Sequence, residues 1–517
     1  MTKPIIKLLS LACLLLAAAN SPAQTASLGL FTDHADVGTV LHLGTAVYDA
    51  AKRTYTITGS GENVWATADA FQFVWKKMDG DFTLSADISI LGQAGDPHKK
   101  AMLMARQSLD ADSPYADVAL HASGLASLQS RDAKGADTHE IQSNISAPKH
   151  LRLQKYGDEF TIWLAGEDGK FQFAGGSMRV PMNGPFYVGL GVCAHNKDAV
   201  DTAEFRNVAL EATSAEVSEH WYETLETIDV ASTDRRVTYV NRNRDASSIG
   251  APTWTPDGVS LLVSHGDRIE SVPVSGGKPK IIDTGGFRVN LSLSVSPDGT
   301  MVGSSGSCCD GSAIFVVPVR GGVLRRVTAK SPAFWQGWSP DGKTILFLLT
   351  DDKYHVGIYT MPVAGGTETH LIGGPGASVR GSAGYSPDGN YIYFHSNHSG
   401  AGEVWRMRSD GSNPEQVTKD GVGDWYPHVS PDGRLLAFLT PERSAPSEMD
   451  IGLEPVTLRV MTLADRHVRV LAKFTGANNS MPSPSWSPDS RRLAFVSYQG
   501  VRTDTERPRM FVPKKVK

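Results

Sequence analysis

Along most of the chain beyond residue 50, apolar and polar residues alternate with a period of two, which is the pattern of strands rather than helices. An alternating strand turns its apolar residues to a core and its polar residues to the opposite face. The clearest runs in the first half are Thr54–Ile57, Phe71–Trp75, Phe82–Ile88, Ala101–Ala105, Ala116–His121, His150–Gln154, Phe160–Trp163, Phe186–Val192 and Ala203–Leu210. Nine short strands with polar connections predict a two-sheet β-sandwich over residues 25–212.

The second half of the chain repeats one tripeptide. Pro-Asp-Gly occurs five times and Pro-Asp-Ser once, and the aspartates are 41, 43, 47, 44 and 57 residues apart. The six copies begin at Pro256, Pro297, Pro340, Pro387, Pro431 and Pro488. Because one four-stranded propeller blade takes about 40–45 residues, this spacing predicts a six-bladed β-propeller over residues 235–505.

The composition of each repeat fits a blade. Proline presets φ, aspartate bonds back to the backbone and glycine accepts positive φ, so each copy is a tight turn between two strands. Gly-Gly or Asp-Gly hairpin turns follow at Gly276, Gly321, Gly365 and Asp410. We expect the strand Arg236–Val240 to complete the last blade beside Leu493–Ser497 and so close the ring.

The repeat, written as Trp-Ser-Pro-Asp-Gly from Trp338 and Trp-Ser-Pro-Asp from Trp486, resembles the TolB-type propeller. The strands Phe186–Val192 and Ala203–Leu210 resemble the last strands of concanavalin-type and laminin-G-like jelly rolls. The fold class expected is therefore all-β: a jelly-roll sandwich followed by a six-bladed TolB-like propeller. Residues 213–234 are expected to be a linker with one or two helical turns in Val217–Ile228, the stretch Thr440–Leu453 an inserted loop, and residues 506–517 a basic tail.

The N-terminus has the order of a secretory signal peptide: Lys3 and Lys7, an apolar run of 12 residues from Leu8, then small residues up to Ala23. We expect cleavage after Ala23 and a periplasmic or secreted protein. The run is shorter than a membrane span. A lipoprotein acylated on Cys13 is a weaker alternative because the apolar run continues past that cysteine. Removing this segment changes the net charge from −5 to −7, which favours neither nucleic acid nor an anionic membrane as partner.

Three cysteines follow the signal segment: Cys193, Cys308 and Cys309. This odd number excludes a disulfide framework and leaves packed sheets to stabilise the fold. Cys308 and Cys309 are expected to be free thiols, with a strained vicinal disulfide as the alternative.

The sandwich is rich in aromatic and hydrogen-bonding residues of the kind that bind sugars, in which an aromatic face stacks on C–H groups while polar side chains bond hydroxyls. Alternation places Asp117 and His121 on one face of a strand. The alternative is that the tryptophans are core residues and the charges are solvated. The set is Trp65, Trp75, Arg106, Asp112, Tyr115, Asp117, His121, Arg131 and His139.

In a propeller the residues before each Pro-Asp turn lie near the mouth of the central channel. The ligand-binding candidates there are Trp335, Trp425 and Tyr426, and the chemically capable ones are Gln336, Asp424 and His428. The propeller resemblance extends to oligogalacturonate lyases, in which histidines and a bound metal carry the reaction. This chain has Leu293, Gln336 and Gly384 at positions where such propellers carry histidine or acidic residues, and it keeps only the His428 segment.

These observations predict an exported, non-catalytic binding protein for a carbohydrate or a cell-envelope partner. No Gly-x-Ser-x-Gly elbow occurs, so a propeller-associated serine hydrolase is not expected. No cofactor is expected either, and a divalent metal would need three or more converging ligands. Two alternatives stay open: a polysaccharide lyase or glycoside hydrolase at the channel mouth, and a Tol-system-like transport or scaffold component.

Overall fold

The computed structural model describes residues 27–92, 94–213, 217–242, 248–285, 289–308, 311–351, 353, 355–374, 379–442, 453–476 and 485–504. Regular structure within these ranges consists of strands alone, which confirms the all-β prediction. None of these residues forms a helix long and apolar enough to cross a membrane. The predicted signal peptide, the basic tail, the Cys308 side chain, Cys309 and most of the predicted insertion lie outside the described residues.

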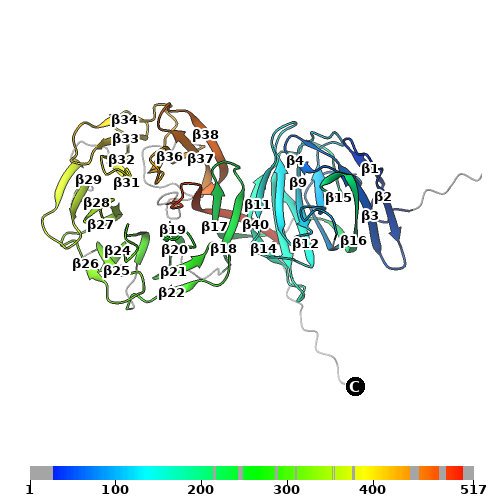
Figure 1. Ribbon diagram of the computed structural model, residues 1–517, viewed down its shortest axis with the longest axis horizontal. Coiled ribbons are helices and arrows are strands. Elements are labelled where there is room, and N and C mark those ends of the chain that lie inside the picture. Colours follow the sequence, from blue (N-terminus) through cyan, green and yellow to red (C-terminus); the bar gives the residue numbers. More distant parts are fainter. Residues whose placement is uncertain are drawn as a thin grey trace, which may run out of the picture.

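Two sheets form the N-terminal half, drawn in blue and cyan in Figure 1, and each of the nine predicted strands lies within an observed one. The first sheet has the order β14 (Gln172–Arg179), β13 (Glu159–Ala165), β12 (His150–Tyr156), β7 (Phe82–Leu91), β16 (Asn196–Ala212), β3 (Thr54–Gly61) and β2 (Thr45–Asp49). The second begins with β1 (Asp33–Val37), β6 (Phe71–Met78), β15 (Phe186–Cys193), β8 (Lys100–Arg106), β9 (Tyr115–His121), β10 (Ala126–Arg131) and β11 (His139–Gln142).

The two sheets share one hydrophobic core. Leu84 of β7 and Leu153 of β12 come from the first sheet, and Leu103 of β8 and Val118 of β9 come from the second, all fully buried. The opposite face of the second sheet is covered by a small hairpin, β4 (Val64–Trp65) with β5 (Ala68–Asp69). Both faces of this sheet are therefore buried, so β8 and β9 contain no exposed residue.

Four separate four-stranded sheets lie around the ring of the C-terminal half (Figure 1). They are propeller-like blades, and each of the first four Pro-Asp-Gly turns joins the first two strands of one of them. The blades are β19 (Ile249–Trp254), β20 (Ser260–His265), β21 (Arg268–Pro273) and β22 (Lys280–Ile282); β23 (Val289–Val295), β24 (Met301–Cys308), β25 (Gly311–Pro318) and β26 (Arg325–Arg326); β27 (Ala333–Trp338), β28 (Thr344–Thr350), β29 (Val356–Pro362) and β30 (Thr369–Gly373); and β31 (Val379–Tyr385), β32 (Tyr391–Ser396), β33 (Glu403–Arg408) and β34 (Glu415–Gln416).

The remaining strands of the ring do not stand alone. They continue the second N-terminal sheet, which reaches 15 strands. They are β18 (Arg235–Asn241), β17 (Val217–Asp229), β40 (Arg492–Asp504) with β39 (Ser485–Trp486) paired to it, β38 (Val468–Gly476), β37 (Glu454–Thr462), β36 (Leu435–Pro441) and β35 (Trp425–Val429). Among the described residues, separate blades thus number four, and the predicted count of six is not confirmed.

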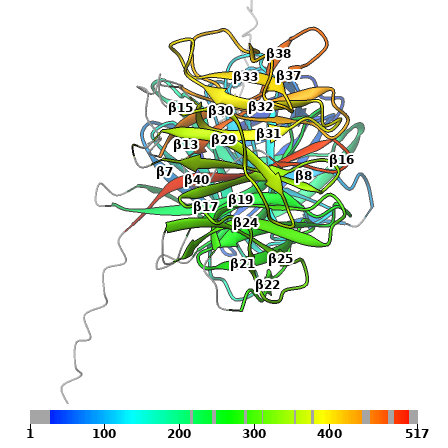
Figure 2. The same cartoon turned by 90° about the vertical axis from the view of Figure 1, so that its left-hand side faces the viewer.

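The junction corrects one prediction. Residues 217–229, expected to hold a helical turn in a linker, form β17, a long strand that pairs antiparallel with β40. Because β17 also pairs with β18, Arg236–Val240 lies in the same sheet as Leu493–Ser497, one strand further along. Residues 224–228 are all buried, so both faces of this strand are covered, and pairing to β40 favours a strand over a helix. Because β18 also pairs in parallel with β11, a single sheet links the two halves of the molecule. Figure 2 shows the blades in front of the N-terminal half.

Candidate functional site

The covered face of the N-terminal sheet gathers most of the predicted sandwich site residues. The register places Arg106, Tyr115 and Arg131 opposite one another on β8, β9 and β10, and Asp117 opposite Gln129. Directly opposed residues in antiparallel strands share a face. The sequence therefore predicted correctly that Asp117 and His121 share one side of β9, but that side is buried beneath the β4–β5 hairpin.

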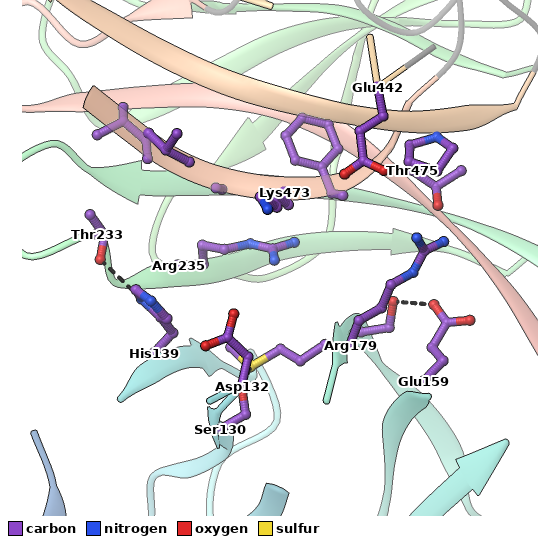
Figure 3. A pocket seen from close by; sticks show the side chains of 17 residues that line it. Ser130, Asp132, His139, Glu159, Arg179, Thr233, Arg235, Glu442, Lys473 and Thr475 are labelled. Carbon is purple, nitrogen blue, oxygen red and sulfur yellow. Dashed lines mark hydrogen bonds between the residues drawn. The ribbon is translucent and has the colours of Figure 1, made fainter. Parts of the chain in front are cut away.

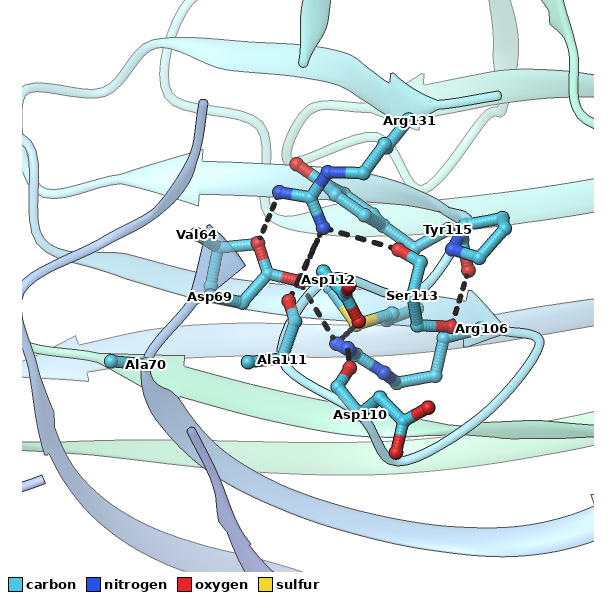
Figure 4. Close-up of polar contacts among 12 residues, drawn as sticks. Val64, Asp69, Ala70, Arg106, Asp110, Ala111, Asp112, Ser113, Tyr115 and Arg131 are labelled. Atoms are coloured by element: carbon cyan, nitrogen blue, oxygen red, sulfur yellow. Dashed lines mark hydrogen bonds and ion pairs between the residues drawn. The ribbon is translucent and has the colours of Figure 1, made fainter. Parts of the chain in front are cut away.

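Asp69 of the hairpin anchors two of these residues, as Figure 4 shows. Its carboxylate oxygens lie 2.8 Å from Nη2 of Arg131 and 3.3 Å from Nη1 of Arg106, and none of the three side chains is exposed. Arg106 also donates to the carbonyl of Asp110 (2.6 Å), and Arg131 to that of Ala66 (2.9 Å). Burial lowers the pKa of Arg106, while the Asp69 charge opposes this shift. These guanidinium groups hold the fold and face no solvent.

A second polar group lies beside this triad. Lys100 donates to the carbonyl of Val64 (2.9 Å) and to Oε1 of Gln129 (3.1 Å), and Gln129 donates to Glu140 (2.8 Å). Neither carboxylate oxygen of Asp117 has a hydrogen-bond partner in the described part of the chain. Burial raises the pKa of Asp117 well above its usual range.

The other predicted sandwich residues are dispersed. Trp65 is half-buried with the Lys100 ammonium 5.2 Å from its ring centre, and Trp75 is a core residue stacked on Phe73. Asp112 lies on the surface and pairs with Lys134 at 2.8 Å. His139 is exposed on β11 and its Nδ1 lies 3.3 Å from Oγ1 of Thr233, at the rim of a cavity between the halves.

This cavity, of about 330 Å³, lies between the two halves of the molecule (Figure 3). Strands β10, β11, β13 and β14 line one wall, and β18, β37 and β38 line the other. Its charged and polar residues are Ser130, Asp132, His139, Glu159, Ser177, Arg179, Thr233, Arg235, Glu442, Lys473 and Thr475, and Phe474 adds an aromatic ring. The mixture of both charges, hydroxyls and one ring can bond a polar ligand and cover its apolar face.

Several cavity residues are held by neighbours. Arg235 donates two hydrogen bonds, each of 2.8 Å, to the fully buried Glu226, and Ser177 donates to Glu159 at 2.6 Å. Arg179 and Lys473 are exposed on opposite walls. Of these residues the sequence pointed only to His139, because most of the wall that faces it comes from β37 and β38, more than 300 residues later.

In the propeller, the predicted aromatic residues stabilise the blades. Trp335 is 2 % exposed and donates from Nε1 to Oγ of Ser294 (2.9 Å). Trp425 stacks on His395 with ring centres 4.2 Å apart. Tyr426 packs against a buried cluster of β36–β40, and burial raises its pKa to about 12. Gln336 accepts a hydrogen bond from the backbone NH of Ala383 (2.7 Å), which ties β27 to β31.

Asp424 immediately precedes β35, and His428 lies within that strand. Oδ1 of Asp424 accepts a hydrogen bond from Thr440 (2.6 Å) and lies 3.4 Å from Arg459, and burial raises its pKa to about 6. Burial lowers the pKa of His428 to about 4. Carboxylate oxygens of Asp424, Glu403 and Asp420 lie within 4.8 Å of one another. Arg459 also contacts Asp420 at 2.6 Å, so its guanidinium offsets part of the negative charge of this acidic group.

Comparisons with known proteins identify the ring. Residues 331–468 match the family described as PD40, the TolB beta propeller domain. The uncharacterized protein Atu1656 of Agrobacterium fabrum is 36% identical over 254 residues, which are 48% of this chain and 84% of that protein. The chain belongs to the TolB-like β-propeller family. A solved structure, of a putative TolB from Agrobacterium tumefaciens, is 33% identical to this TolB-like chain with a TM-score of 0.51, and the match covers 55% of this chain and all of that one.

A relative with a named system is more distant. The Tol-Pal system protein TolB of Francisella tularensis is 24% identical over 248 residues, which are 46% of the TolB-like chain and 54% of the Francisella protein. The chain thus spans about half the length of that protein. The predicted resemblance of the repeat to TolB is confirmed.

Proposed function

We propose that this TolB-like chain is an exported, non-catalytic binding protein of the cell envelope that holds a carbohydrate in the cavity between its two halves. The observation that carries the proposal is the shared lining of that cavity: Asp132, His139 and Arg179 come from the N-terminal half, and Glu442 and Lys473 from the C-terminal half. A site built by both halves explains why the two are joined in one chain.

The chemistry of the lining favours a polyhydroxylated ligand. Hydroxyl groups donate and accept, so a sugar can bond Glu159 or Asp132 as acceptors and Arg179 or Lys473 as donors, while Phe474 offers an apolar surface. The parallel pairing of β11 with β18 holds the walls at a constant separation, and a preorganised site loses less entropy on binding.

The envelope location and the finer architecture are part of the proposal. A signal peptide over residues 1–23 and the relation to a Tol-Pal system protein support a periplasmic or secreted protein with envelope partners. The six Ser/Thr-Pro-Asp turns support a ring of six blades, with β35–β38 as the fifth and β39, β40, β17 and β18 as the sixth. The two sheets around one core support a jelly-roll sandwich.

The test is a glycan and polysaccharide screen on residues 24–517 by thermal shift and calorimetry. The matched variants are Lys473→Ala in the cavity and Lys343→Ala in an exposed blade turn; neither lysine is buried. We expect Lys473→Ala and Arg179→Ala to weaken binding about tenfold or more, since each hydrogen bond from a charged group contributes about 1.5–3 kcal/mol, and Lys343→Ala to leave it unchanged. Glycan binding that survives both cavity variants, or an envelope protein captured without any glycan affinity, would refute the proposal.

A further inference from the structure

Three histidines from three separate segments meet at one end of the covered N-terminal sheet. His98 precedes β8, His121 ends β9 and His195 lies in the turn between β15 and β16. The ring centre of His98 is 5.9 Å from that of His121 and 5.5 Å from that of His195. The sheet explains this meeting, because β15, β8 and β9 are neighbours and the register aligns Cys193, Lys100 and His121.

The two turns that carry His98 and His195 are fixed by buried contacts. Lys99 is 1 % exposed and donates to the carbonyl of Ala94 and to Oδ1 of Asp201, each at 2.6 Å, which holds the turn before β8. His195 has a φ of 55°, a left-handed conformation that is costly for a non-glycine residue and marks a constrained position. Asn63 lies 3.1 Å from its Nε2 and Asp96 lies 3.4 Å from its Nδ1.

The buried imidazole of His121 supports a ligand at this position independently of the ring distances. It is 5 % exposed, and neither ring nitrogen has a hydrogen-bond partner within the described ranges. Leaving a buried polar group unsatisfied costs about 1–3 kcal/mol, so such a group in a folded protein points to a ligand.

The spacing of the rings fits coordination of one ion. A zinc-bound imidazole nitrogen lies about 2.0–2.1 Å from the metal, so the centres of two rings bound at a tetrahedral angle lie roughly 5 Å apart. The two measured separations exceed this by less than 1 Å, but the ring nitrogens of the three histidines do not all lie within 4.8 Å of one another, so coordination requires the exposed His98 ring to rotate. Carboxylates also flank the rings, Asp96 beside His195 and Glu140 3.9 Å from Nε2 of His121, as in metal sites whose histidines are oriented by outer carboxylates.

We propose that His98, His121 and His195 form a binding site for a divalent transition-metal ion such as Zn²⁺. Three imidazoles leave a fourth position for water or an external ligand. The Lys100 ammonium, which would repel the ion, is directed to Val64 and Gln129, and the charge of Glu140 lies nearby to offset it. The site lies on a different face from the cavity between the halves and does not depend on the carbohydrate proposal.

The experiment is calorimetric titration of metal-free residues 24–517 with Zn²⁺, and with Co²⁺ to read its visible absorption. We expect one ion per chain with tetrahedral Co²⁺ bands. His98→Ala, whose ring is exposed, should keep the fold and weaken binding about 100-fold, since it removes one of three ligands. His42→Ala, an exposed histidine of the same half, should bind as the wild type does.

Two outcomes would overturn the proposal. One is the absence of one-to-one binding tighter than about 10 µM in the wild type. The other is binding that Asp420→Asn abolishes and His98→Ala does not, which would place the ion at the acidic group of the propeller. Circular dichroism of each variant verifies the fold, so a loss in His98→Ala with an intact spectrum is attributable to the ligand.

Discussion

The polar side-chain contacts of the two halves differ in sequence separation and in burial. In the C-terminal half, the same short-range bond recurs in each Pro-Asp turn, where a Ser or Thr hydroxyl donates to the aspartate two residues later at 2.5–2.6 Å. In the N-terminal half, the central polar contacts join residues far apart, such as Asp69 with Arg131 at a sequence separation of 62. The first contact is repeated and joins a largely buried hydroxyl to an exposed aspartate, and the second is unique and fully buried.

This difference predicts how much stability each half loses when one polar contact is removed. The aspartate of each turn is exposed, so water can take the place of the lost hydroxyl and the loss affects one blade slightly. A buried charge that loses its partner has no such replacement, and the cost reaches several kcal/mol. The following changes test this contrast in order of decreasing expected effect.

Asp69→Ala should have the largest effect. It leaves two fully buried guanidinium groups without their carboxylate, and breaking a buried pair costs about 3–5 kcal/mol. Urea unfolding monitored by hydrogen exchange of β8–β10 measures the loss. Asp112→Ala is the matched control, since that exposed aspartate pairs only at the surface with Lys134 and should cost less than about 1 kcal/mol. Equal losses in the two variants would contradict the contrast.

Arg235→Ala tests the junction of the halves. The change removes the guanidinium that pairs with the buried Glu226 carboxylate, which keeps its hydrogen bond from Ser497. We expect the free energy of unfolding to fall by about 3 kcal/mol. Adding Glu226→Gln should recover part of the loss because no charge is then left unpaired. Calorimetric unfolding measures both. A single variant as stable as the wild type would show that the pair contributes nothing at this junction.

His428→Gln tests the response of the propeller to acid. Burial favours the neutral imidazole, so the folded pKa of about 4 lies below the ordinary value of 6.5. Stability is therefore full above pH 6.5 and falls as the pH drops towards 4. Between pH 7 and pH 4 the wild type should lose about 2 kcal/mol more than the variant, after allowance for partial exposure of the ring. His467→Gln, an exposed histidine, should follow the wild type in the same pH series.

Ser339→Ala should have the smallest effect. Its hydroxyl donates to Asp341 and accepts from the NH of Thr344 at 2.9 Å, and the loss should be about 1 kcal/mol. Ser487→Ala removes the same bond in the turn that has Ser490, at a φ of 60°, in place of glycine. Thermal unfolding should show similar losses in the two variants. A difference of several kcal/mol would mean that the turns are not equivalent units.

The sequence by itself was sufficient for nine strands of the N-terminal half and for the four separate blades that carry the first four Pro-Asp turns. Both signals are local: alternation needs only adjacent residues, and a turn needs only four. The same locality explains the error at residues 217–229. Their composition is compatible with a helix. They form a strand because they pair with β40, which lies about 275 residues later in the chain.

The tertiary structure alone decided which polar residues meet. Asp117 and His121 were placed on one face from alternation, but their burial depends on the β4–β5 hairpin, held by Asp69, which carries no motif. The cavity at His139 required β37 and β38 to lie beside β11, and the histidine group required three turns to meet at one sheet end. Such contacts follow from strand order and register, which depend on the whole chain rather than on any short segment of it.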